Sequence, residues 1–269
     1  MSLPPQPSCV ITGAGSGFGR ALAIELGRRG ARLILADINP VAVEEAAHEA
    51  IGAGAQSADA RQCDVARADD VGALANAAAG SIDLVVNNAG VSTAGLVGAL
   101  PLDDWRWTID VNLLGVIYGC HSFVPRLRAQ GHGHLLNVAS AAGLLCAPRM
   151  AAYNVAKAGV IALSETLSAE LAGTGVGITV ICPTYFRTDI VRSGRFVDPA
   201  LRALAERLVA KGPPADVVAR AALASVKRGE LYSLPMADGR WLWRLKRLSP
   251  RAFRTLLVWA SAERARSPM

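Results

Sequence analysis

Long hydrophobic runs are missing from this chain of 269 residues. Apolar residues make up 52% of it, yet no window approaches the roughly 18 uninterrupted apolar residues of a membrane-spanning helix. The opening residues, MSLPPQPS, also lack the basic start and the apolar run of a secretory signal peptide. We therefore expect a cytoplasmic protein.

Cysteine is scarce as well, and its distribution excludes a disulfide framework. The cysteines are odd in number, widely spaced and embedded in apolar segments. They are Cys9, Cys63, Cys120, Cys146 and Cys182. This pattern is typical of reduced thiols in a cytosolic protein. We expect all of them to be small core residues.

Most of the chain has almost no net charge. The formal net charge is +6, but residues 239–269 contain eight basic residues and one acid and so carry +7 by themselves. Residues 1–238 therefore carry −1. A nucleic-acid-binding domain of the usual kind carries its positive charge on the folded face, so the composition argues against nucleic acid as a partner.

Short apolar runs that suit strands alternate with longer stretches of helical pattern. The strand candidates are CVIT (9–12), LILAD (33–37), QCDV (62–65, the end of a weak strand), IDLVVN (82–87), HLLNVAS (134–140) and GITVICP (177–183). Helical stretches are expected at about 17–29, 40–53, 103–129 and 151–171, with another after 65. Continuous rather than alternating apolar strands indicate that helices cover both faces of the sheet.

The order of elements predicts an α/β fold. We expect a Rossmann-like, doubly wound, seven-stranded parallel sheet with helices on both faces. A single dinucleotide-binding catalytic domain is expected over residues 1–238, followed by a basic, helical C-terminal extension over residues 239–269. In such sheets the ligand lies beyond the carboxyl ends of the strands, so the residues just after each strand are the informative ones.

A glycine-rich turn, TGAGSGFG (12–19), joins the first strand to the first helix. Glycines allow a tight turn and let backbone N–H groups approach a pyrophosphate at the helix N-terminus. The common fingerprint G-x-G-x-x-G is not met from Gly13, because Phe18 occupies the place of the third glycine. The turn alone could therefore be a phosphate-binding loop or simply a tight connection.

The next strand ends at Asp37, twenty residues after Gly17. A carboxylate at this point can accept hydrogen bonds from both ribose hydroxyls of an adenosine and would repel a 2′-phosphate. Neither Ser16 nor Ile38 supplies a cation to hold that phosphate. The sequence favours NAD over NADP as the cofactor.

Tyr153 and Lys157 stand four residues apart in AYNVAK (152–157), within an expected helix. Positions i and i+4 share one face of a helix. The pair could be ordinary exposed decoration, or a phenol whose pKa is lowered by a nearby ammonium. The sequence around the pair decides between these two interpretations.

Several motifs occur together and in one order, and they resemble the short-chain dehydrogenase/reductase family. They are TGAGSGFG (12–19), NNAG (87–90), Asn112, Ser140 and the Tyr153–Lys157 pair. The family's turn has the form T-G-x-x-x-G-x-G, and the resemblance covers about residues 8–235. It implies an oxidoreductase that transfers a hydride between NAD and a secondary alcohol or ketone. It also implies a homodimer or homotetramer, formed through the long helices near 103–129 and 151–171.

The resemblance implies catalytic roles for four residues. Tyr153 would take the hydroxyl proton during alcohol oxidation, and Lys157 would lower the pKa of that tyrosine and bond the nicotinamide ribose. Ser140 would hold the substrate oxygen, and Asn112 would position a water for proton exchange.

It also implies a row of cofactor contacts along the strand ends. They are Gly13, Ser16, Gly17, Phe18 and Gly19 at the phosphates, Asp37 at the ribose, Asp64 and Val65 at the adenine, Asn88, Ala89 and Gly90 along the channel, Tyr153 and Lys157, and Pro183 and Thr188 at the nicotinamide. Two positions depart from the family pattern. The family commonly has Pro-Gly where this chain has Pro183-Thr184, and Phe18 replaces a small aliphatic residue, so its ring is expected nearer the nicotinamide.

The substrate pocket is expected to be mostly apolar. Its predicted residues are Leu144, Leu145, Tyr185 and Phe186, which suggest a steroid, retinoid, terpenoid or long-chain alcohol. Nearby arginines leave open an acidic substrate group. No metal site is expected, because His132 and His134 have no acidic or cysteine ligand nearby and are interpreted as surface loop residues.

The extension, with RWLWRLKRL (240–248) and then Ser249-Pro250, admits three interpretations. Phe253, Leu256, Leu257 and Ala260 fall at helical spacing. The extension could dock on its own or a partner subunit and cover the substrate cleft, or lie as a basic amphipathic helix on an anionic membrane with its tryptophans at the interface. Nucleic-acid binding ranks below both.

Four functions are compatible with these observations. The first is the NAD-dependent alcohol dehydrogenase. Its alternatives are an NADP-dependent ketoreductase and a catalytically silent protein that senses a dinucleotide. A peripheral membrane scaffold would depend on the extension alone.

Overall fold

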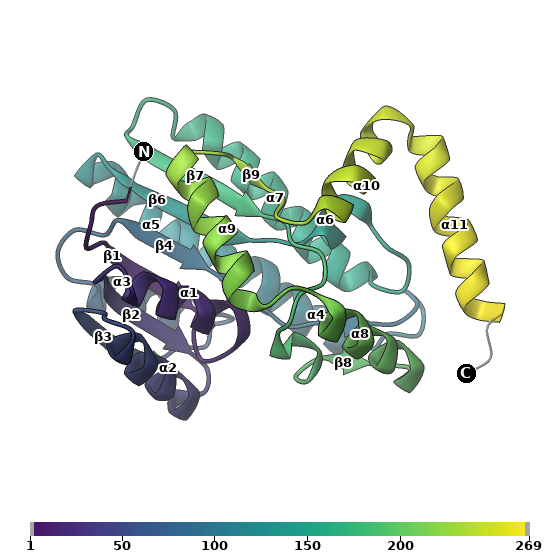
Figure 1. Ribbon diagram of the computed structural model, residues 1–269, viewed down its shortest axis with the longest axis horizontal. Coiled ribbons are helices and arrows are strands. Elements are labelled where there is room, and N and C mark those ends of the chain that lie inside the picture. Colours follow the sequence, from purple (N-terminus) through teal and green to yellow (C-terminus); the bar gives the residue numbers. More distant parts are fainter. Residues whose placement is uncertain (1–2, 267–269) are drawn as a thin grey trace.

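The computed structural model describes residues 3–266, with side chains described as far as residue 259. Its centre is a parallel sheet of seven strands in the order β3-β2-β1-β4-β6-β7-β9 (Figure 1). These strands are β1 (Ser8–Thr12), β2 (Arg32–Asp37), β3 (Ser57–Gln62), β4 (Leu84–Asn87), β6 (Gly133–Val138), β7 (Val176–Ile181) and β9 (Tyr232–Ser233). The predicted doubly wound, seven-stranded sheet is confirmed.

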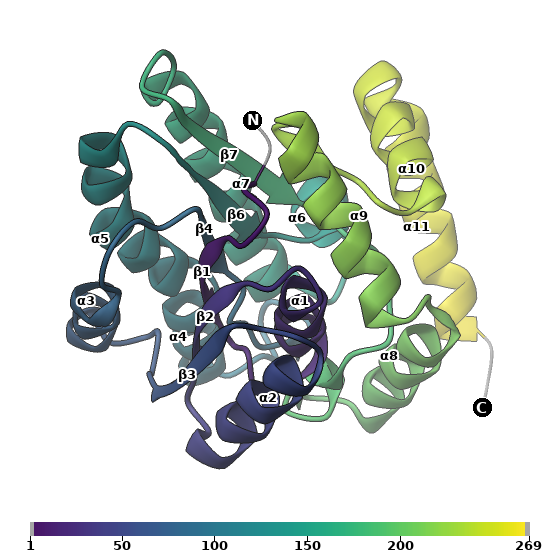
Figure 2. The same ribbon diagram turned by 60° about the vertical axis from the view of Figure 1, so that its left-hand side comes forward.

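Helices cover both faces of this sheet (Figure 2). One face carries α1 (Gly17–Gly27), α2 (Pro40–Gly52) and α9 (Ala215–Arg228), whose apolar residues form one core cluster with the sheet. The other face carries α3 (Ala68–Ala77), α5 (Gly115–Gln130) and α7 (Ala151–Glu170), which form a second cluster. The two layers exclude water from β1, β4 and β6, which explains their continuously apolar sequences.

The remaining elements lie at the carboxyl edge of the sheet or beyond it. They are β5 (Thr93–Ala94) paired with β8 (Arg195–Phe196), α4 (Leu102–Ile109), α6 (Ala141–Leu145), the 3-10 helix Asp189–Val191, α8 (Pro199–Lys211), α10 (Ala237–Leu248) and α11 (Pro250–Arg266). The carboxyl ends of β1 and β4 lie next to each other where the strand order reverses, which is the usual ligand position in this fold.

Two strand predictions differ from the structure. The weak strand expected to end at 65 ends at Gln62; the Cys63 N–H still bonds to the Asp37 carbonyl of β2, and a turn at 65–66 begins the connection to α3. The strand β9 was not predicted, because no strand-like run of sequence marks it. It has two residues, Tyr232 and Ser233, which pair with β7. Its register comes from tertiary contacts rather than from a local pattern.

The long helix expected near 103–129 is interrupted. A π-helical segment, Asp110–Leu114, separates α4 from α5. Such segments insert one extra residue per turn and are frequent at functional sites. Asn112 lies in this segment and is fully buried.

The extension forms two helices joined at Ser249-Pro250. Ser249 ends α10, and its carbonyl and hydroxyl accept hydrogen bonds from the N–H groups of Phe253 and Ala252, as an N-cap does. The first of these helices begins at Ala237, two residues before the predicted boundary at 239. Phe253 is buried, and the Ala260 side chain lies outside the described residues.

The interpretation of His134 as a surface loop residue is wrong. This histidine lies in the middle of the sheet on β6 and is 2% exposed, with its Nε2 bonded to the Thr179 hydroxyl at 2.8 Å. Its Nδ1 has no hydrogen-bond partner among the described residues, and burial lowers the pKa of His134 to about 4. His132 is exposed as expected. Over residues 3–259, no group of three or more His, Cys, Asp or Glu side chains is arranged to hold a metal ion.

Burial of His134 makes the stability depend on pH. His134 binds a proton below pH about 6.5 in the unfolded chain, but only below about 4 in the folded chain. The free energy of unfolding is therefore highest above pH about 6.5 and falls as the pH drops from there to about 4. We expect His134→Gln to remove about 3 kcal/mol of the acid-induced loss in free energy of unfolding. Urea unfolding at neutral pH and at pH about 4 measures this. His132→Gln is the control, and an identical pH dependence for both variants would contradict the prediction.

Cys146 is also an exception to the sequence prediction. Four cysteines are buried, but Cys146 is exposed at the end of α6 with a left-handed φ of 55°.

In the described part of the chain, no helix combines the length and the apolar character needed to span a bilayer.

Candidate active site

The glycine-rich turn between β1 and α1 leaves no room for side chains. Gly13 has φ 64°, and a Cβ there would stand 2.6 Å from Ala89 Cα. A Cβ on Gly19 would collide with the carbonyl oxygen of Gly13, and one on Gly17 would lie 2.5 Å from Thr188 Oγ1. The turn therefore depends on glycine at these positions for close backbone packing.

Thr12 and Asn88 hold the turn against the neighbouring strand. Asn88 Nδ2 donates to the carbonyls of Thr12 and Gly13 at 2.8 and 2.9 Å. Thr12 Oγ1 accepts from the N–H groups of Asn88 and Ala89 at 3.0 and 3.2 Å. Thr12 begins the glycine motif but was not among the predicted site residues.

Asp37 lies at the carboxyl end of β2, facing this turn. Its Oδ2 accepts from the Gly15 N–H at 2.9 Å and its Oδ1 from the Asn39 N–H at 3.0 Å. The carboxylate is half-buried, while Ser16 and Ile38 beside it are exposed and carry no positive charge. The residue is thus held by two backbone donors, and each carboxylate oxygen can accept a further hydrogen bond.

Asp64 and Val65 follow β3. Asp64 accepts a hydrogen bond from the Ala66 N–H at 3.0 Å, and Val65 is buried against the backbone of α5 at Gly115. A Cβ at Gly90 would stand 3.0 Å from Asn112 Oδ1 and 3.5 Å from Lys157 Nζ. The NNAG motif is therefore next to the predicted catalytic residues.

Asn112 is fixed to the segment after β4. Its Oδ1 accepts from the Val91 N–H at 2.7 Å, and its Nδ2 donates to the Val91 carbonyl at 2.8 Å. Both bonds depend on the π-helical turn, which directs this side chain inward.

Ser140 follows β6 as the N-cap of α6, where its hydroxyl accepts from the Ala142 N–H at 3.1 Å. The same hydroxyl lies 3.4 Å from the Pro183 carbonyl and is hydrogen-bonded to the Tyr153 side chain. Two predicted catalytic hydroxyls that are distant in sequence are thus in contact.

Lys157 is buried one turn after Tyr153 on α7. Its ammonium donates to the Val138 carbonyl at 2.7 Å and lies 5.8 Å from the centre of the Tyr153 ring. Burial lowers the pKa of Lys157 to about 8. The Cys182 thiol, which sequence reasoning did not assign to the site, acts in the opposite direction on this lysine, and burial raises the pKa of that thiol to about 12.

The expected lowering of the tyrosine pKa is not found. Burial raises the pKa of Tyr153 to about 12, and the hydrogen bond with Ser140 offsets only part of that. The phenol is 8% exposed, and the positive end of Lys157 is occupied by a carbonyl oxygen. Loss of solvation therefore outweighs the attraction between the two groups.

The segment after β7 closes the site from the far side. Pro183 accepts a bond from the Ala141 N–H at 2.9 Å. Thr184, where the family commonly has glycine, donates to Asp238 Oδ1 at 3.1 Å and so ties this segment to α10. Sequence reasoning flagged Thr184 as a departure but could not find its partner, which lies 54 residues away.

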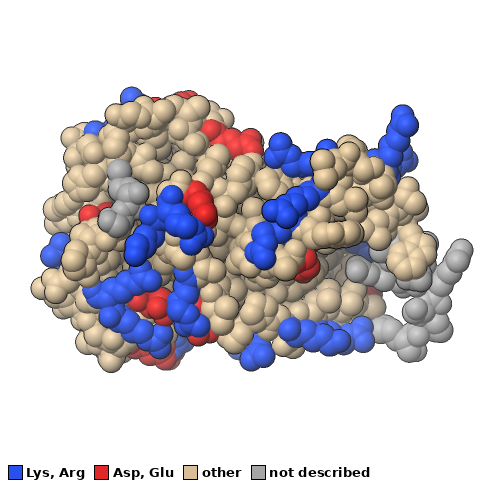
Figure 3. All heavy atoms as spheres, turned by 45° about the horizontal axis from the view of Figure 1, so that its top comes forward, with Lys and Arg blue, Asp and Glu red and all other residues tan. Residues whose placement is uncertain are grey.

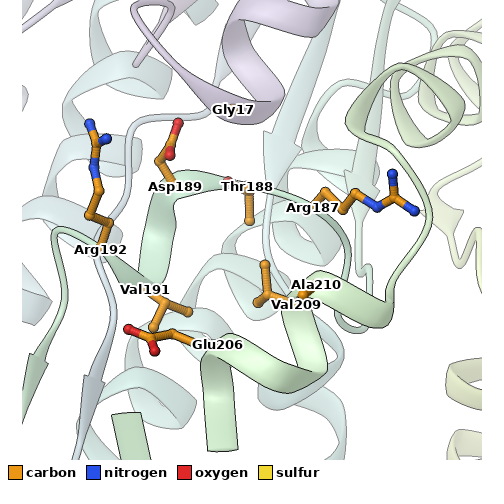
Figure 4. Close-up of a pocket in the computed structure, with 9 residues that line it drawn as sticks. All are labelled: Gly17, Arg187, Thr188, Asp189, Val191, Arg192, Glu206, Val209 and Ala210. Atoms are coloured by element: carbon orange, nitrogen blue, oxygen red, sulfur yellow. The ribbon is translucent and has the colours of Figure 1, made fainter. Parts of the chain in front are cut away.

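A cavity of about 510 Å³ lies between Gly17 of the glycine turn, the segment 187–192 and α8 (Figure 4). Thr188 and Asp189 line it next to Gly17, while the Arg187 side chain extends away from that glycine. Val209 and Ala210 of α8 close the other side. The cavity thus connects the start of α1 to the Thr188 segment.

The predicted substrate residues do not form one surface. Leu144 is buried and Leu145 half-buried on α6, and Tyr185 is 41% exposed. Phe186 packs in the core, with its ring 5.6 Å from that of Phe18 in an edge-to-face arrangement. The Phe18 side chain is therefore directed into the core on the α1 face of the sheet.

These residues fit a nicotinamide dinucleotide. The turn at 12–19 presents close-packed backbone at the N-terminus of α1, which suits a pyrophosphate. Asp37 supplies an acceptor at the next strand end. Lys157 and Asn112 lie beside Gly90, farther along the same edge.

A family model described as short chain dehydrogenase matches residues 8–195. The chain belongs to the short-chain dehydrogenase/reductase family. It is 35% identical over 260 residues to the probable oxidoreductase EphD of Mycobacterium tuberculosis. The match covers 91% of this chain and 43% of EphD, so the chain spans less than half the length of that relative.

Other relatives match over most of both chains. The 2-(R)-hydroxypropyl-CoM dehydrogenase of Xanthobacter autotrophicus is 32% identical, with 80% of this chain and 87% of the relative covered. Cyclohexanol dehydrogenase of an Acinetobacter species is 34% identical, with 68% and 74% covered.

Solved structures share the fold. A short-chain dehydrogenase/reductase from Burkholderia phymatum, in complex with NAD, has a TM-score of 0.87 and 32% identity, covering 92% of this chain and 95% of its own. A short-chain dehydrogenase from Sphingobium yanoikuyae, in complex with NADPH, has a TM-score of 0.76 and 27% identity, covering 87% and 91%.

Proposed function

We propose that the protein is an NAD-dependent dehydrogenase that acts on a hydrophobic secondary alcohol or the corresponding ketone. The observation that carries this proposal is the environment of Tyr153. Its buried phenol is hydrogen-bonded with Ser140 and stands one helical turn from the fixed ammonium of Lys157. A proton donor, an oxygen-binding hydroxyl and a cation are thus grouped as carbonyl chemistry requires.

The bound dinucleotide would supply or accept the hydride. Tyr153 would donate its proton to the ketone oxygen in reduction, and its raised pKa keeps it in the donor form at neutral pH. In alcohol oxidation the phenolate is required, and the Lys157 ammonium favours that form electrostatically. Ser140 would hold the substrate oxygen and stabilise its charge. The Asn112 side chain is fixed by two hydrogen bonds to the Val91 backbone and would position a water for proton exchange beside Lys157.

The choice of NAD is supported by Asp37. Its carboxylate is aimed at the glycine turn and can accept hydrogen bonds from ribose hydroxyls, whereas a 2′-phosphate would meet a like charge. Exposed Ser16 and Ile38 offer no compensating cation. The alternative, an NADP-dependent ketoreductase, would need a cation that these positions do not supply.

A hydrophobic substrate is supported by Leu144 and Leu145 on α6, beside Ser140. It is also supported by the relative named for cyclohexanol, a cyclic secondary alcohol. The substrate classes proposed are a steroid, retinoid, terpenoid or long-chain alcohol. A dinucleotide-sensing protein without turnover is the second candidate, but such a protein would not need the Tyr153–Ser140 contact.

A cofactor-reduction screen tests this proposal. We expect NAD to be reduced with cyclohexanol and larger lipophilic secondary alcohols, and NADP to be a much poorer acceptor. The absorbance of reduced nicotinamide reports turnover, with sugars and polyols as polar controls. Activity confined to the polar alcohols would contradict the substrate class, and dinucleotide binding without any hydride transfer would favour the sensing protein.

A further inference from the structure

The described part of the extension carries positive charge that pairs with no described carboxylate. Over residues 239–259 there are six basic residues and no acid: Arg240, Arg244, Lys246, Arg247, Arg251 and Arg254. Up to residue 259 none of them forms an ion pair, whereas many arginines of the main domain pair with a carboxylate. Figure 3 shows one face of the molecule, and basic side chains (blue) lie on the extension at the right of that view.

One side of α10 is used for docking on the main domain. Lys246 donates to the Leu144 carbonyl at 2.5 Å, and Trp243 packs on Tyr232 with ring centres 5.3 Å apart. Gly239 is buried against Thr184. The first helix of the extension therefore docks on its own subunit, beside the predicted substrate residues of α6.

The opposite side of α10 is uncovered and apolar at its centre. Trp241 and Leu248 are 61% and 86% exposed, and they share one face with the exposed Arg244 at positions i, i+3 and i+7. Arg240 and Arg247 flank that face. Tryptophan flanked by arginine is typical of a helix that lies at a membrane interface.

The second helix has the same character. Arg251, Arg254 and Val258 share one face of α11, and all three are exposed, Val258 by 61%. Trp259 is 58% exposed near the last described side chain. Large apolar side chains and unpaired cations are thus interleaved along both helices.

We propose that these exposed faces, defined by Trp241, Arg244 and Leu248 on α10 and by Arg251 and Val258 on α11, bind the headgroup region of an anionic lipid membrane. Arginine side chains would contact lipid phosphates, and Trp241 and Leu248 would enter the boundary with the acyl chains. A second copy of this chain is a poor occupant, because a symmetric contact would bring two surfaces of like charge together. Nucleic acid would leave the exposed Leu248 and Val258 unburied.

Flotation of the full chain with lipid vesicles tests this surface. We expect association with vesicles made of equal parts phosphatidylglycerol and phosphatidylcholine, none with phosphatidylcholine alone, and weaker association as salt rises. The triple variant Arg244→Gln, Arg247→Gln and Arg251→Gln should weaken association about 100-fold, at about fivefold for each cation. Trp241→Ser with Leu248→Ser should weaken it further and remove the fluorescence shift of the tryptophan on insertion.

A matched control removes the same charge from the main domain. Arg29→Gln, Arg32→Gln and Arg128→Gln change three exposed arginines there and should retain association with the anionic vesicles. Circular dichroism and thermal unfolding show that all variants are folded. The proposal is overturned if the unmodified chain does not float with anionic vesicles at low salt, or if both triple variants lose association with them equally. It is also overturned if the extension binds DNA but not vesicles, or if its substitutions change only the oligomeric state. None of these readouts depends on the dehydrogenase activity.

Discussion

Tyr153→Phe is expected to reduce kcat for hydride transfer about 1000-fold while the affinity for the dinucleotide stays unchanged. Loss of a general acid–base group costs between about 100-fold and 10,000-fold. Phenylalanine fills the same buried space and removes only the hydroxyl that contacts Ser140. Steady-state kinetics on a substrate from the screen, with dinucleotide binding measured by calorimetry, separate the two effects.

The control for this variant is Tyr118→Phe. Tyr118 is a half-buried tyrosine on α5 that packs on the core and makes no recorded contact with Ser140 or Lys157. It should leave kcat unchanged. Undiminished turnover of Tyr153→Phe would refute the proton-transfer role and leave the buried phenol as a packing residue.

Asp37→Asn is expected to change cofactor preference by roughly 100-fold, measured as the ratio of kcat/KM for NADP to kcat/KM for NAD. Asparagine keeps the size of the side chain but loses charge-assisted hydrogen bonds to the ribose, each worth about 1.5–3 kcal/mol. It also removes the repulsion of a 2′-phosphate. The change should appear mainly in KM, since the groups at Tyr153 are untouched.

Asp59→Asn is the matched control for that change. Asp59 lies on the neighbouring strand β3, is exposed and pairs with Arg61. It alters net charge by the same amount without facing the glycine turn. If the unmodified chain already prefers NADP, or if the two variants shift the ratio equally, Asp37 does not select the cofactor.

The central sheet could be predicted from the sequence because the apolar pattern of each strand reflects how deeply that strand is buried. Continuous apolar runs such as 82–87 and 134–140 are possible only between two helical layers, and those layers are present. The short strand β9 carries no such signal, since two residues are held by β7 alone. The π-helical turn at Asn112 could not be predicted either, because the hydrogen bonds to Val91 that accompany it join residues 21 positions apart.

The candidate site followed from sequence where the spacing is local. Tyr153 and Lys157 share a helix face because they stand four residues apart. Their protonation could not be predicted in the same way, since it depends on how completely the fold removes water around them. His134 and Cys146 were misjudged for a related reason. Exposure of a single polar or small residue is decided by the elements packed over it, not by its neighbours in the chain.

The hydrogen bond from Thr184 to Asp238 joins the segment after β7 to the beginning of the C-terminal extension. Thr184 immediately follows Pro183, whose carbonyl meets Ser140, and Asp238 belongs to the first turn of α10. A displacement of that helix would therefore break this bond or shift the segment that meets Ser140. A glycine at position 184 has no hydroxyl, so it could not form this bond.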